Sequence, residues 1–163
     1  MSRLVVWTPT LADVGRIVRS PCDGTREEFE AFQFPKDEDT RIVALWNYVL
    51  HSGELCWAFG ADHKAVAIMG ATPQNKNELQ TWWAGHKDCE RVMRDLTVKM
   101  ARLLDAEIGK WMRGRPQGLL HLMTSHRGAR YEKWYGLIGF KWVEERNGFQ
   151  LYERRAEHVL QQA

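Results

Sequence analysis

The hydrophobic pattern of the chain is strongest over residues 89–113, which it predicts to form one long amphipathic helix. Apolar residues recur there at three- and four-residue spacing, while charged residues occupy the opposite face. Asp88 is placed to cap the start of this helix, and Gly114 with Pro116 ends it. Residues 78–84, directly before it, are rich in aromatic and β-compatible side chains and predict a strand. Because backbone N–H groups at a helix start are unpaired, we expect any ligand site at this junction.

A first strand over residues 4–8 is followed by a predicted run of helices, each with a recognisable start. Thr10 is placed to cap the first helix, and Thr25 with Glu28 has the spacing of a capping box for the second. The predicted helices cover residues 11–19, 26–32 and 40–51. Together these elements predict that helices precede most of the sheet.

After Gly53 the pattern changes to short apolar runs of strand length. The predicted strands cover residues 54–60, 64–72 and 78–84, and only short turns separate them. Parallel neighbours need a crossover of about a dozen residues or more, so these three strands predict an antiparallel meander.

The last third of the chain predicts a strand, a helix and a hairpin. The strand covers residues 118–124, and Ser125 is placed to begin a helix over 128–137. Asn147-Gly148 is a strong hairpin signal and predicts pairing of residues 140–145 with 149–154. Residues 156–163 predict a frayed helical turn. The whole order predicts a single α/β domain over residues 1–163, with one mixed, mostly antiparallel sheet flanked by helices.

Composition narrows the classes of function. Hydrophobic residues make up 44% and charged residues 27% of the 163 positions, as in ordinary soluble domains. A net charge of +2 is too small to indicate a nucleic-acid partner, and no apolar run reaches membrane-spanning length. Three cysteines without a C-x-x-C pair indicate a reducing compartment. We therefore expect a soluble, cytoplasmic protein. Its eight Trp residues exceed what one small core needs, which favours a groove or an interface with another protein.

The segment from Tyr135 to Phe140 resembles a motif of the GNAT family of acetyl-CoA-dependent N-acetyltransferases. In that family a helix ends in Tyr, three residues and Gly-Phe, and Tyr135, Gly139 and Phe140 have this spacing. The resemblance implies a GNAT-like fold, acetyl-CoA as cofactor and Tyr135 as the general acid that protonates the leaving thiolate. Residues 82–85 and 130–140 also resemble GNAT-like virion assembly proteins of T7-like tailed phages. That narrower resemblance implies phage structural proteins as partners and a place in the host cytoplasm or the virion.

The sequence departs from the family where the pyrophosphate of the cofactor binds. The family has Arg or Gln, two residues, Gly, one residue and Gly or Ala between the fourth strand and the long helix. Residues 84–90 contain only Gly85, and Asp88 with Glu90 adds negative charge. Such charges stabilise a helix start by ~0.3–1 kcal/mol each and occupy the place of an anion. Gly128 stands where the family often has Asn. Both departures predict weak cofactor binding.

For several residues the sequence allows both a functional and a structural interpretation. Tyr135 is either the general acid or a half-buried tyrosine with a local hydrogen-bond partner. Trp82 and Trp83 face opposite sides of a strand, so one lies in the core and the other faces a ligand or a protein partner. Arg113, Arg115, Arg127 and Arg130 form either a steering patch or a solvated rim.

The cysteines and histidines also allow a purely structural interpretation, without metal binding or catalysis. His86 and Cys89, joined by His121 or His126, lack the second spaced pair of a zinc site, so no metal is expected. Cys89 near a helix start is either a nucleophile with a lowered pKa or a structural thiol. Without an assignable His–acid partner, the structural thiol is the expectation.

The sequence supports two hypotheses of function. The first is a GNAT-like phage protein with a degenerate cofactor loop, a pseudo-enzyme that binds protein partners during virion assembly. The second is an acetyl-CoA-dependent N-acetyltransferase acting on an unknown amine. In the second, Tyr135 is the acid, and the cofactor is held at Trp82, Trp83, Ala84, Gly85 and His86. The oligomeric state is left open.

Overall fold

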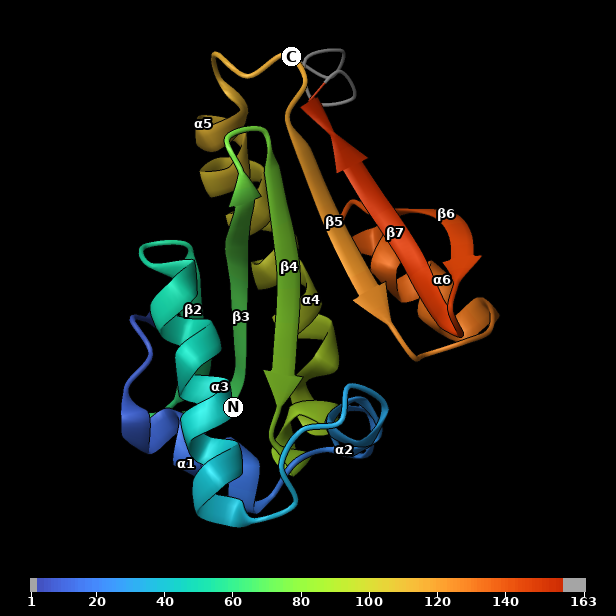
Figure 1. Cartoon of the computed structure of the whole chain (residues 1–163). Coiled ribbons are helices and arrows are strands. Elements are labelled where there is room, and N and C mark those ends of the chain that lie inside the picture. Colours follow the sequence, from blue (N-terminus) through green and yellow to red (C-terminus); the bar gives the residue numbers. More distant parts are fainter. Residues whose placement is uncertain (1–2, 157–163) are drawn as a thin grey trace. The chain divides into compact units, whose positions relative to one another are not determined.

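A computed structural model of the chain describes residues 3–156 and confirms the predicted mixed α/β fold (Figure 1). Seven strands form one sheet in the order β1-β2-β3-β4-β5-β7-β6. The strands are β1 Val5–Trp7, β2 Cys56–Ala61, β3 Lys64–Asn75, β4 Glu78–Gly85, β5 Leu119–Thr124, β6 Lys141–Arg146 and β7 Phe149–Arg155. The helices are α1 Leu11–Arg19, α2 Asp23–Ala31, α3 Glu38–Ser52, η1 Lys87–Val92, α4 Met93–Leu103, η2 Leu104–Ile108, α5 Gly109–Met112 and α6 Ala129–Leu137. The frayed turn expected over 156–163 lies almost wholly outside the described residues.

The chain divides into two compact units, each with its own buried residues. The first contains residues 3–72 and Trp82–Leu96, and the second contains Pro73–Thr81 and 97–156. Apolar residues of α1, α2, α3 and strands β2 to β4 form the core of the first unit, including Val14, Ile17, Phe29, Leu45, Ala58 and Ile68. Buried residues of the second unit include Leu104, Ile108, Leu120, Tyr135 and Tyr152.

Local capping chemistry sets the start of α1 as predicted, but not the start of α2. Thr10 Oγ1 accepts from Asp13 N–H at 3.3 Å, and Asp13 Oδ2 accepts from Thr10 N–H at 2.9 Å. The capping box predicted at Thr25 is wrong, because α2 begins at Asp23 and Thr25 lies inside it. Thr25 is buried, and its hydroxyl accepts a hydrogen bond from Gly85 N–H at 2.8 Å. Thr25 therefore links α2 to the end of β4 and does not cap a helix.

The predicted antiparallel meander of three strands is confirmed. β2 pairs antiparallel with β3, and β3 lies next to β4 with no helix between them. A connection of two residues joins β3 to β4, which only antiparallel neighbours allow. Asp62 and His63 turn the chain between β2 and β3 with φ values of 50° and 59°.

The long helix predicted over residues 89–113 is wrong as a single α-helix. A 3₁₀ segment, η1, comes first, α4 follows, and a π-helical turn, η2, separates α4 from α5. From α4 onward its buried residues are Leu96, Met100, Leu104, Ile108 and Met112, which recur every four positions. A four-residue repeat drifts by about 40° per step around an α-helix of 3.6 residues per turn. A π-helical turn accommodates an extra residue and keeps this repeat buried on one side.

The strand order at the end of the chain was not predicted. β7 lies between β5 and β6 and pairs antiparallel with both, as Figure 1 shows. β4 pairs with β5 in parallel, from Glu78 with Leu119 to Thr81 with Leu122. The predicted hairpin is confirmed, with φ values of 51° at Asn147 and 84° at Gly148. The helix predicted over residues 128–137 is confirmed as α6, but the cap predicted at Ser125 is wrong, because Gly128 directly precedes the helix with a φ of 100°.

Candidate functional site

The junction between β4 and η1 lies in the first unit and contains five of the six residues predicted for the site. Ala84, Gly85 and His86 are buried, whereas Trp82 and Trp83 are partly exposed. The predicted helix cap at Asp88 is wrong: His86 precedes η1, and its Nδ1 accepts from Asp88 N–H at 3.1 Å. The strand therefore ends and the helical segment begins close to where the sequence predicts, but His86 caps the segment in place of Asp88.

Trp82 packs against α3. Its Nε1 donates to Ser52 Oγ at 2.9 Å, and its ring meets Tyr48 edge-on at 5.7 Å. Gly70 provides the space for this ring, because a Cβ there would lie 2.6 Å from Trp82 Cζ2. Trp82 is thus fixed by contacts inside the first unit.

The backbone N–H groups of the junction are already bonded within the protein. Gly85 N–H donates to Thr25 Oγ1, His86 N–H to Val66 O and Lys87 N–H to Ser20 O, at 2.8, 2.8 and 2.9 Å. Asp88 N–H donates to His86 Nδ1 at 3.1 Å, and Cys89 N–H to His86 O at 2.9 Å. Five consecutive donors are therefore occupied, where binding of phosphate by a helix start requires donors that point outward.

Two side chains of the junction, Asp88 and His86, offer no free positive charge to an anion. Asp88 Oδ2 accepts from Arg16 Nη2 at 3.1 Å, and Arg16 Nε donates to Ala65 O at 2.9 Å. Burial and the nearby Arg16 guanidinium lower the pKa of His86 below its usual value, so His86 is neutral at pH 7. The residues present therefore do not fit a pyrophosphate group held by the junction backbone.

Tyr135, the sixth predicted site residue, lies in the second unit and is fully buried at 0% exposure. Its hydroxyl donates to Thr124 Oγ1 at 3.2 Å and lies 3.1 Å from His126 Nδ1. His126 is itself buried and stacks on Tyr131, with the ring centroids 4.4 Å apart. Sequence reasoning did not connect Thr124 or His126 to Tyr135. The alternation along β5 was the available signal, since it places Leu120, Leu122 and Thr124 on the buried side.

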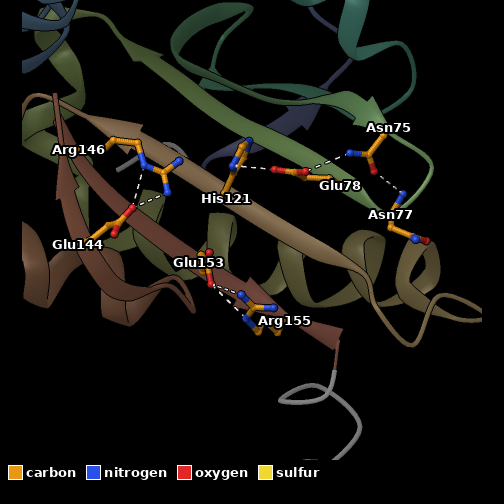
Figure 2. A network of polar contacts seen from close by, with 8 residues as sticks. All are labelled: Asn75, Asn77, Glu78, His121, Glu144, Arg146, Glu153 and Arg155. Atoms are coloured by element: carbon orange, nitrogen blue, oxygen red, sulfur yellow. Dashed lines mark hydrogen bonds and ion pairs between the residues drawn. The ribbon is translucent and has the colours of Figure 1, made fainter.

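A polar network on strands β3 to β7 was also missed from the sequence (Figure 2). His121 Nδ1 lies 3.1 Å from Glu78 Oε1, and Asn75 Nδ2 donates to Glu78 Oε2 at 3.1 Å. The buried Nε2 of His121 has no hydrogen-bond partner within the described residues. Burial lowers the pKa of His121, whereas the carboxylates of Glu78 and Glu153 raise it and Arg146 lowers it. The net direction is downward, so the ring is neutral near pH 7.

The histidines and cysteines weighed as metal ligands are dispersed. His86 and Cys89 lie at the junction, while His121 and His126 lie in the second unit with the partners described above. Within residues 3–156 no group of three or more His, Cys, Asp or Glu side chains is placed to hold a metal ion. No helix in that range is long and apolar enough to cross a membrane.

The predicted basic group around β5 is partly engaged in local contacts. Arg115 donates to Lys76 O at 3.0 Å and lies over the Trp111 ring. Arg127 donates to Glu145 Oε1 at 2.9 Å and to Gly148 O at 2.8 Å. These two side chains hold turns and strands in place, which favours the solvated rim over the steering patch.

The strand order, the parallel β4–β5 pair and the flanking helices are those of the GNAT N-acetyltransferase fold, and comparison with solved structures shows this fold for the chain. PaiA N-acetyltransferase from Thermoplasma acidophilum, in complex with coenzyme A, is 14% identical with a TM-score of 0.65, covering 95% of this chain and 99% of that one. A GNAT-family acetyltransferase from Staphylococcus aureus Mu50 is 13% identical with a TM-score of 0.61, covering 94% and 99%. A chimera of the spermidine N-acetyltransferase SpeG from Vibrio cholerae and hSSAT is 12% identical with a TM-score of 0.63, covering 98% and 99%. No protein-family model and no curated protein sequence matches the chain.

Proposed function

We propose that this chain is a GNAT-fold protein that does not hold acetyl-CoA through its junction backbone and acts by binding protein partners. One observation carries the proposal: the five consecutive N–H groups from Gly85 to Cys89 are all bonded inside the first unit. A pyrophosphate would have to displace these bonds. Each buried donor or acceptor left unpaired in the process costs ~1–3 kcal/mol.

The role in virion assembly of a T7-like tailed phage is part of the same proposal. It rests on the resemblance of residues 82–85 and 130–140 to that group of proteins. Phage structural proteins are then the partners, and the host cytoplasm and the virion are the places to look. Detection of the chain by mass spectrometry in purified particles of its phage is the expected result. Its absence from such particles and from their assembly intermediates would remove this part of the proposal.

An acetyl-CoA-dependent N-acetyltransferase acting on an amine is the second candidate, and the comparisons with solved structures favour it. The structures reported above are acetyltransferases, and one of them was solved with coenzyme A. In this candidate Tyr135 is the general acid and residues 82–86 lie along the cofactor. The burial of Tyr135 and the engagement of its hydroxyl with Thr124 and His126 count against that role in the described conformation.

Thermal unfolding with acetyl-CoA separates the two candidates. A ligand at one hundred times its dissociation constant adds ~2.7 kcal/mol, a shift of several degrees in Tm. The proposal predicts no shift of that size at millimolar acetyl-CoA. A shift of several degrees at micromolar acetyl-CoA, together with transfer of a labelled acetyl group to an amine such as spermidine, would establish the second candidate instead.

A further inference from the structure

Two cysteines that are far apart in the sequence lie side by side in the first unit. Cys22 directly precedes α2, and Cys89 lies in η1. Backbone hydrogen bonds join the two segments, from Cys22 N–H to Gly85 O and from Lys87 N–H to Ser20 O, both at 2.9 Å. Figure 1 shows α2 beside the end of β4. A disulfide between these positions would therefore link segments that are already in contact.

The two sulfur atoms converge on Gly85. A Cβ built on this glycine would lie 2.9 Å from Cys89 Sγ and 3.2 Å from Cys22 Sγ. Both sulfur atoms therefore occupy the space that a side chain at position 85 would need. Both cysteines are free thiols, and both are buried, at 5% exposure for Cys22 and 1% for Cys89.

Hydrogen bonds make the two thiols chemically unequal. The Cys89 thiol donates to the sulfur of Cys22 and lowers the pKa of Cys22 to about 6. The same bond and burial raise the pKa of Cys89. Thr25 Oγ1 lies 3.3 Å from Cys22 Sγ and accepts from Gly85 N–H, so its own hydrogen is available to a Cys22 thiolate. Cys22 is therefore the more readily ionised thiol of the pair, whereas the sequence offered a lowered pKa at Cys89 only as the alternative to the structural thiol expected there.

A surface cavity leads to Cys22. It has a volume of about 350 Å³, and its lining includes Cys22, the basic side chains of Arg19, Arg26 and Lys87, and the acidic side chains of Asp23 and Glu90. The cavity therefore brings a molecule as small as a peroxide up to Cys22.

We propose that Cys22 and Cys89 form an oxidisable thiol pair, in which Cys22 reacts with a hydroperoxide and Cys89 resolves the product to a disulfide. In the first step the Cys22 thiolate attacks one peroxide oxygen, the O–O bond breaks, and Cys22 sulfenic acid and hydroxide form. In the second step the Cys89 sulfur attacks the Cys22 sulfur, the S–O bond breaks, and water leaves with the Cys89 proton. Two thiols are oxidised, and one hydrogen peroxide is reduced to two waters. The inference does not depend on the proposed function.

Cys56 is a control within the same chain. It lies on β2, is 4% exposed, and burial raises its pKa to about 12. A thiol that stays protonated reacts slowly with peroxide. We therefore expect Cys56 to remain reduced under conditions that oxidise the other two cysteines.

The test is treatment of the full-length protein with hydrogen peroxide, followed by alkylation and peptide mass spectrometry without reduction. The expected result is one cross-linked peptide pair joining Cys22 to Cys89, with Cys56 alkylated. Retention of all three thiols, or oxidation of Cys56 at the rate of Cys22, would overturn the proposal. This measurement needs no substituted protein.

Single substitutions then separate the two roles. Cys89→Ser should leave a sulfenic acid at Cys22 that dimedone traps, whereas Cys22→Ser should leave Cys89 unreacted. Cys56→Ser is the matched control and should form the disulfide as the native chain does. Dimedone labelling of Cys89 in the Cys22→Ser protein at the native rate would contradict the assigned order of the two cysteines.

Discussion

At the residue scale, two tryptophans with different surroundings provide the sharpest contrast. Trp82 packs on Tyr48 and fills the space left by Gly70, while Trp142 on β6 is 48% exposed. Trp82→Ala should destabilise the protein by about 3 kcal/mol, because it removes a packed ring and its bond to Ser52. Trp142→Ala should stay within about 0.5 kcal/mol of the native chain. Urea unfolding of both variants checks this, and equal losses of stability would refute the contrast.

Trp142 also changes the sequence-based view of the interface. The sequence predicted that one of Trp82 and Trp83 faces a ligand or a protein partner. The structure gives Trp82 and Trp134 partners within the chain, since Trp134 Nε1 donates to Thr97 Oγ1 at 2.8 Å. Among residues 3–156, Trp142 is the most exposed tryptophan. If a protein partner is anchored by tryptophan, Trp142 is the better residue to test first.

His121 should make the stability of the protein fall on mild acidification. Burial lowers its pKa in the folded state, so the unfolded chain takes up a proton first as the pH falls below about 6.5. The contribution of neutral His121 to the free energy of unfolding is complete above pH 6.5 and declines below it. His121→Asn keeps a donor toward Glu78 and cannot titrate, so its stability should decline less between pH 6.5 and 5.

The exposed His63→Asn variant is the control for that measurement, because Asn also tolerates the φ of 59° found at this turn. Urea unfolding at several pH values gives the comparison. A decline as steep in His121→Asn as in the native chain would show that His121 does not contribute to it.

At the element scale, the β6–β7 hairpin depends on backbone conformation rather than on side-chain space. A Cβ at Gly148 would meet nothing within 4 Å, but its φ of 84° is costly for other residues. Gly148→Ala should therefore destabilise by ~1–2 kcal/mol. Gly136→Ala in α6, where a Cβ also meets nothing, should stabilise by ~0.4–1 kcal/mol instead. Thermal unfolding of the two variants should give Tm shifts of opposite sign, and shifts of the same sign would contradict this account.

Local signals in the sequence predicted the elements that local chemistry sets. The cap at Thr10, the turn at Asn147-Gly148 and the meander of β2, β3 and β4 follow from residues within a few positions of one another. The place of β7 between β5 and β6 does not, because strand order is decided by pairing between distant segments. The start of α2 was mistaken for the same reason, since the hydroxyl of Thr25 bonds Gly85.

At the scale of the whole molecule, the sequence predicted the fold more completely than the candidate site. The motif from Tyr135 to Phe140 and the order of elements predicted the GNAT fold, which the structural comparisons show. The single Gly of the junction predicted a degenerate cofactor loop, but its occupied N–H groups depend on Ser20, Thr25 and Val66, which no local pattern connects to it. The Cys22–Cys89 pair could not be predicted from the sequence either, because its two residues come from distant segments of the chain.

The most direct test follows the five backbone amides of the junction by ¹⁵N NMR during titration with acetyl-CoA. If the hydrogen bonds of Gly85 to Cys89 close the junction, these amide resonances should stay in place up to millimolar acetyl-CoA, and the amides should exchange slowly with deuterium. Saturable shifts of the same resonances at micromolar acetyl-CoA would contradict the account, because the N–H groups would then be turning to the cofactor.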